Sequence, residues 1–120
     1  MKKILTIKTN PKVFFIQFLD ILSPITKITG KESEVLAELM LQNYNKRHIP
    51  LDDRFKLIFS SEFRKQMQTN LNVSGPVFRN CISKLRKLKV IVDNRLNEYY
   101  NIDNLDDELQ IIFNWEIDGK

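Results

Sequence analysis

Residues 71–91 read LNVSGPVFRNCISKLRKLKVI, and their spacing predicts a helix with one apolar and one polar face. Ser74 is a typical N-cap, and Gly75 and Pro76 fall in the first turn, where proline removes no needed hydrogen-bond donor. Cations from Lys84 to Lys89 complement the negative end of the helix dipole. The apolar positions are Leu71, Val73, Phe78, Cys81, Ile82, Leu85 and Leu88, and the polar face carries Arg79, Asn80, Ser83, Arg86 and Lys87. One face is therefore expected to pack and the other to meet a partner.

The same stretch resembles the second half of the DNA-binding motif in MarR-type regulators and in the winged-helix replication initiators of plasmids and phages. The matching residues are Leu71, Val73, Ser74, Phe78, Cys81, Ile82, Leu85, Val90 and Ile91. ITGKESEVLAELM at 28–40 resembles the first helix of that domain, and EYYNID at 98–103 resembles its second wing strand. Lys89 departs from the pattern, which often has glycine there, so we expect a different corner between the helix and the wing.

The resemblance implies a mostly α fold with a small β-sheet, namely a winged helix-turn-helix over residues 29–103. It also implies duplex DNA as the partner, with the helix from Ser74 in the major groove. Residue by residue, the positions facing DNA would be Gly75, Pro76, Val77, Arg79, Asn80 and Ser83. Arg79 would donate two bonds to a guanine edge and Asn80 would pair with adenine, while Lys84, Lys87 and Arg95 would hold phosphates.

Charge is distributed unevenly along the chain, whose net charge is +4. Residues 54–95 hold ten Lys or Arg against two acids, a balance of +8, whereas residues 96–120 hold seven acids against one lysine, a balance of −6. The positive charge thus coincides with the predicted DNA-reading segment, as binding to phosphates requires. Arg95 lies in the predicted wing tip, where it is either a phosphate contact or an ordinary surface residue.

Composition argues against an enzyme and against a metal or cofactor site. The single cysteine, Cys81, excludes an intrachain disulfide and falls on the apolar stripe, as a small core residue does. His48 is the only histidine, so a Cys/His zinc cluster is not expected, and the three glycines form no phosphate loop. No apolar run spans a membrane and no signal peptide is apparent, so a cytoplasmic protein of one domain is expected.

The N-terminal part, residues 1–28, is predicted to form a strand over 2–8 and a helix that opens with Asn10 and Pro11 and stops after Leu22. This helix is apolar on most sides, so it is covered either by its own chain or by a second subunit, which would make a homodimer through residues 11–22. The next helix begins with the capping-box spacing of Thr29 and Glu32.

Two later segments complete the prediction. Residues 54–59 fit a short helix or a strand, and Ser60 or Ser61 can cap the helix that precedes Leu71. Within the acidic segment 104–120, the side chains Ile111, Phe113, Trp115 and Ile117 alternate with Ile112, Asn114, Glu116 and Asp118, as in a strand. That strand would pair with residues 2–8 and bury Trp115, or it would serve a protein partner.

We therefore expect a duplex DNA-binding protein, acting as a transcription regulator or as a replication-associated factor of the phage or plasmid type. The alternative is a structural or adaptor module, such as a virion component or a polymerase-docking protein, that uses the same fold for protein contacts. Electrostatic binding to DNA would weaken sharply with salt, whereas an apolar protein contact would not.

Overall fold

The computed structural model describes residues 2–103 and 109–116, which form five helices and two antiparallel strand pairs. The helices are α1 Pro11–Thr26, α2 Gly30–Asn45, α3 Leu51–Ile58, α4 Ser61–Leu71 and α5 Gly75–Lys87, and the strands are β1 Lys2–Thr9, β2 Ile91–Val92, β3 Arg95–Leu96 and β4 Leu109–Glu116. The prediction of a mostly helical chain with little sheet is confirmed. Within these described residues, no helix is long and apolar enough to cross a membrane.

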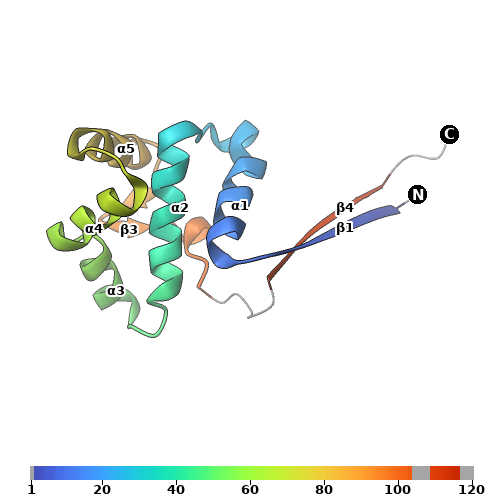
Figure 1. Ribbon diagram of the computed structural model, residues 1–120, viewed down its shortest axis with the longest axis horizontal. Coiled ribbons are helices and arrows are strands. Elements are labelled where there is room, and N and C mark those ends of the chain that lie inside the picture. Colours follow the sequence, from blue (N-terminus) through green and yellow to red (C-terminus); the bar gives the residue numbers. More distant parts are fainter. Residues whose placement is uncertain (1, 104–108, 117–120) are drawn as a thin grey trace.

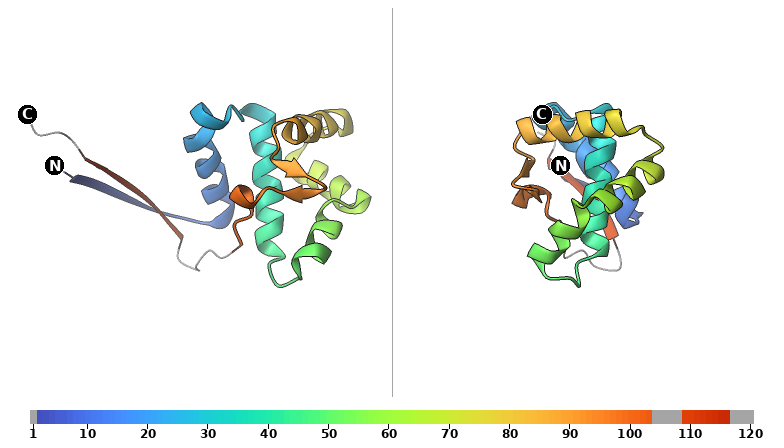
Figure 2. Two further views of the ribbon diagram at one scale, coloured as in Figure 1. Left: turned by 180° about the vertical axis from the view of Figure 1, so that it is seen from behind. Right: turned by 90° about the vertical axis from the view of Figure 1, so that its left-hand side faces the viewer.

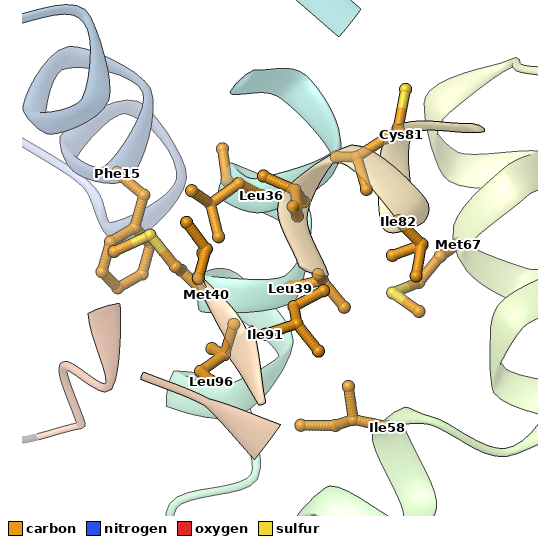
Figure 3. Packing of buried hydrophobic residues seen from close by; sticks show 14 of the residues in the cluster. Phe15, Leu36, Leu39, Met40, Ile58, Met67, Cys81, Ile82, Ile91 and Leu96 are labelled. Carbon is orange, nitrogen blue, oxygen red and sulfur yellow. The ribbon is translucent and has the colours of Figure 1, made fainter. Parts of the chain in front are cut away.

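α2 lies in the middle of the molecule, with α1 on one side and α3, α4 and α5 on the other (Figure 1). Leu36, Leu39 and Met40 on this helix are fully buried. Figure 3 shows these side chains between Phe15 of α1 and Ile82 of α5. α2 is the centre of the core because it has apolar contacts on both sides. Burying each of these large side chains contributes about 1.5–3 kcal/mol to stability.

α5 has the amphipathic character that its sequence predicts. The Ser74 hydroxyl caps the helix by accepting the Val77 N–H at 3.3 Å. The buried residues of the helix are Phe78, Cys81, Ile82 and Leu85. The prediction that Leu88 also packs is wrong, because α5 ends at Lys87 and Leu88 remains 41% exposed.

α1 continues past the proline at which it was expected to stop. The predicted end after Leu22 is wrong, since the helix runs through Pro24 to Thr26. Proline has no N–H to bond the carbonyl of Asp20 four residues earlier. The Ser23 hydroxyl donates to that carbonyl at 2.9 Å, so the acceptor keeps a partner and the helix can continue.

The hairpin of β2 and β3 follows α5 directly and is shorter than predicted, with two paired residues in each strand. Asp93 and Asn94 connect the strands, and both have positive φ, 52° and 54°. Two consecutive positive φ angles are the signature of the type I′ turn, whose twist matches that of a hairpin. Lys89, at the corner before β2, also has positive φ (62°), so it takes a conformation that glycine adopts more easily.

The assignment of 98–103 as the second wing strand is wrong. The turn between the strands consists of only two residues, Asp93 and Asn94. The return strand therefore begins at Arg95, earlier than it would after the five-residue turn that the sequence predicted. The Asn97 side chain then accepts the Tyr99 N–H at 3.1 Å, which starts a 3₁₀ turn over Glu98–Tyr100. Extended backbone therefore ends before the EYYNID segment.

Residues 51–58 form a helix, α3. The sequence left a helix and a strand open for residues 54–59, and the structure has the helix. Its Arg54 is buried, and the guanidinium donates to the backbone carbonyls of Ile49 and Arg47 at 3.0–3.2 Å. It also donates to Asn43 Oδ1 at 3.1 Å and to Asp103 Oδ2 at 2.9 Å. One side chain thus joins α3, the end of α2, the loop between them and the segment after β3.

β1 and β4 pair antiparallel along all eight residues of each strand, with Lys2 opposite Glu116. This confirms the predicted pairing of the two ends of the chain. Figures 1 and 2 show that the two strands form a ribbon that extends away from the helices. Residues 104–108 and 117–120, with most of the predicted acidic segment, lie outside the described residues, as does the side chain of Trp115.

Replacing Arg54 with methionine is expected to lower the free energy of unfolding by about 3 kcal/mol, because a buried charge-assisted network loses its donor. Urea denaturation measures this change. Lys56→Met on the exposed side of the same helix is the control, and its effect should stay within about 0.5 kcal/mol. A loss of less than about 1 kcal/mol for Arg54→Met would contradict the assigned role.

The paired ribbon predicts slow hydrogen exchange at those amides of residues 109–116 that bond to β1, relative to an unstructured peptide of the same sequence. Exchange followed by mass spectrometry gives the measurement. An isolated two-stranded ribbon is only marginally stable, so protection below that of α2 is expected. Complete exchange of residues 109–116 at the first time point would contradict the pairing.

Candidate nucleic-acid interface

α4 and α5 are joined by a tight turn of three residues, 72–74. α4 begins at the Ser60 cap, whose hydroxyl accepts the Phe63 N–H at 3.3 Å, so Ser60 and not Ser61 is the cap. It ends at Asn72, which has a left-handed conformation (φ 54°) that asparagine tolerates better than most residues. The Val73 N–H then bonds to the Gln68 carbonyl at 3.1 Å and closes the turn. These bonds fix the direction in which α5 leaves α4.

The face of α5 opposite the core is polar and exposed. Of the predicted DNA-facing residues, Gly75 is half-buried, and the exposed ones are Pro76, Val77, Arg79, Asn80 and Ser83. Gly75 is partly covered because Arg79 Nη1 lies 3.4 Å from the point where a Cβ on Gly75 would stand. The predicted phosphate contact Lys87 is also exposed, near the end of the helix.

Lys84 differs from the exposed residues of α5 named above because it forms an ion pair within the chain. Its ammonium lies 3.1 Å from the Glu32 carboxylate at the start of α2. The pKa of Glu32 is lowered because its carboxylate accepts a hydrogen bond from the backbone N–H of Glu32 itself and another from Lys84. Thr29 is the N-cap of α2, as the capping-box spacing indicates, but its side chain makes no cap hydrogen bond. Glu32 instead ties α2 to α5.

Arg95 is likewise paired with an acid. It is the first residue of β3 and lies beside the turn, whose tip is formed by Asp93 and Asn94. Its guanidinium bonds to the carboxylate of Asp52 in the first turn of α3. The two sequence-predicted phosphate contacts Lys84 and Arg95 therefore each have a carboxylate partner within the chain.

Sequence reasoning did not single out Arg64, which the fold brings beside α5. Arg64 is half-buried on α4, and it lines a small hollow of about 130 Å³ together with Arg79 and Arg86. The remaining lining residues are Phe78, Ile82 and Ser83. Arg64 belongs to the positively charged segment, but only the crossing of α4 over α5 indicates that it meets the other two arginines.

The hollow is strongly cationic because three arginines and no carboxylate line it. Arg86 Nη2 donates to Asn94 Oδ1 at 3.1 Å, which connects the hollow to the turn of the hairpin. Among residues 10–103, whose side chains the structure describes, neither Arg64 nor Arg79 forms an ion pair. Like charges gathered without a counter-charge favour an anionic partner.

Cys81 lies on the buried face of α5, where burial raises the pKa of its thiol. A protonated, buried thiol is a poor nucleophile. His48 lies on an exposed turn after α2. The polar chemistry available at the surface of α5 is therefore that of guanidinium, ammonium, amide and hydroxyl donors.

No protein family, curated protein or solved structure matches the chain. A function must therefore be inferred from the geometry and charge of its own residues.

Proposed function

We propose that the chain binds duplex DNA through a winged helix-turn-helix made of α2, α4, α5 and the β2–β3 hairpin. The observation that carries the proposal is the exposed cationic face of α5, on a helix whose other face is fixed against α2. The major groove of DNA admits one helix, which must present polar side chains while it is held from behind. α5 meets both requirements.

In this arrangement the first half of α5 reads the bases. Arg79 donates two bonds to a guanine edge and Asn80 bonds to an adenine, since their side chains match those donor and acceptor patterns. Gly75 and Pro76 have little bulk, so the start of the helix can approach the DNA closely. They offer no polar side chain for readout, and we therefore propose modest sequence specificity.

Phosphate contacts hold the helix in place. Lys87 is available for this role, whereas Lys84 and Arg95 must exchange Glu32 and Asp52 for phosphate oxygens. Both pairs are on the surface, and exposed ion pairs contribute only about 0–1 kcal/mol, so the exchange costs little. The biological role that fits such a protein is regulation of transcription or a part in replication.

A second candidate function is that of an adaptor that binds another protein. The ribbon of β1 and β4 favours it, because within the described residues each strand is paired on one side only and can accept a further strand on the other. The adaptor would retain its partner at high salt, whereas DNA would be released.

We also propose a homodimer through α1. Phe15 and Leu19 are buried against the chain's own core, but large apolar side chains remain on the outside of the helix. The exposed ones are Val13, Ile16, Ile21 and Ile25. Contact with a second copy would cover them and would place two α5 helices on one face of a DNA duplex.

DNA binding predicts a strong dependence on salt. With about four to six phosphates neutralised per subunit, the slope of log affinity against log salt should be roughly −4 to −5 in fluorescence anisotropy. Arg79→Ala should cost about 1–3 kcal/mol and relax the preference at one base position, while Lys87→Ala should weaken all sequences alike and change the slope by about one unit. Absence of binding to any duplex at low salt would overturn the proposal.

The dimer is tested by sedimentation velocity at micromolar concentration. The wild-type chain should sediment as a species of twice the 14.3 kDa subunit mass, and Ile21→Glu should shift it to the monomer because a charge then faces the apolar contact. Asp20→Asn, next to Ile21 on the same exposed stretch, is the control and should leave the dimer intact. A wild-type monomer would contradict the proposed contact.

A further inference from the structure

We propose that the hollow between α4 and α5 is a binding site for one phosphodiester group of the DNA backbone, held by Arg64 and Arg86, while Arg79, which also lines the hollow, keeps its proposed contact to a guanine. This inference rests on the proposed function and adds a contact that residue pattern alone does not indicate. The site would position the duplex against α4 as well as α5.

The three arginines reach the hollow from two helices. Arg79, Ser83 and Arg86 are spaced four and three residues apart, so they share one side of α5. Arg64 lies across from them in the first half of α4. Phe78 and Ile82 are buried and form the apolar floor, so a ligand can enter only from the solvent side.

The donors suit a phosphodiester. A guanidinium presents several N–H groups in one plane and binds phosphate oxygens in pairs, more strongly than neutral donors do. The Ser83 hydroxyl adds a further donor at the edge of the hollow. A carboxylate that could neutralise the site is missing from its lining residues. The hydrogen bond of Arg86 to Asn94 couples the bound phosphate to the hairpin turn, which would fix the hairpin against the same strand of DNA.

The test compares Arg64→Gln with Lys65→Gln, its neighbour on α4, which is exposed and does not line the hollow. Both variants remove one positive charge, so a general effect of net charge would weaken DNA binding equally. A specific site predicts that Arg64→Gln weakens binding to a fixed duplex about eightfold at 0.1 M salt, the effect of one lost phosphate contact, and flattens the salt slope by about one unit. Lys65→Gln should change the affinity less than about twofold.

Equal losses in the two variants would overturn the phosphate site and leave the proposed function standing, whereas failure of the wild-type chain to bind DNA would overturn both. Thermal melting checks that each variant folds. Should Arg64→Gln not fold, Arg64→Lys replaces it: the charge stays but the paired donors are lost, and unchanged DNA affinity would overturn the site. If inorganic phosphate stabilises the wild-type chain but not Arg64→Gln, while DNA affinity is the same for both, the hollow takes a free anion and the proposal is overturned.

Discussion

The arrangement of the other elements depends on the hydrogen bonds of the buried Arg54 guanidinium. Its five hydrogen bonds reach Asn43, Arg47, Ile49 and Asp103, so every N–H of the group has an acceptor. Asn43 also donates to Asn101 Oδ1 at 2.7 Å, which holds the chain shortly after the hairpin. Because the other end of the hairpin is fixed by α5, both of its ends are anchored, and its turn stays beside α5 where Asn94 meets Arg86.

Acidic residues near α5 determine which cations are paired in the free chain. Glu32 is an acid in the first turn of α2 and Asp52 is one of two in the first turn of α3, where both suit the positive end of the helix dipole. They pair with Lys84 and Arg95, whereas no carboxylate of residues 10–103 pairs with the arginines that line the hollow. The net charge of the segment therefore overstates its free positive charge, and three of its cations without an ion pair to residues 10–103 line the hollow between α4 and α5.

The sequence was sufficient for local features whose causes are local. The Ser74 cap and the buried face of α5 follow from residue spacing and capping chemistry, and both are present in the structure. The pairing of the chain ends is not local; it is inferred because two apolar strand edges would otherwise stay exposed, and it too is present. Two predictions, the end of α1 and the second wing strand, are wrong because in each case a single side-chain hydrogen bond changes the local structure. Pro24 does not end α1 because Ser23 replaces the lost donor, and residues 98–100 leave the strand because Asn97 caps a turn. The position of Arg64 depends on how two helices cross, which residue spacing does not encode.

The most direct test of the account is a titration of the isotope-labelled chain with a short duplex, followed by amide chemical shifts at low and at moderate salt. Binding through α5 predicts that the largest shifts occur within residues 74–87, with smaller ones around Arg64 and in the hairpin turn, and that added salt reverses them. Shifts confined to α1 or to the β1–β4 ribbon, or shifts that persist unchanged as salt is raised, would contradict recognition of DNA by this face.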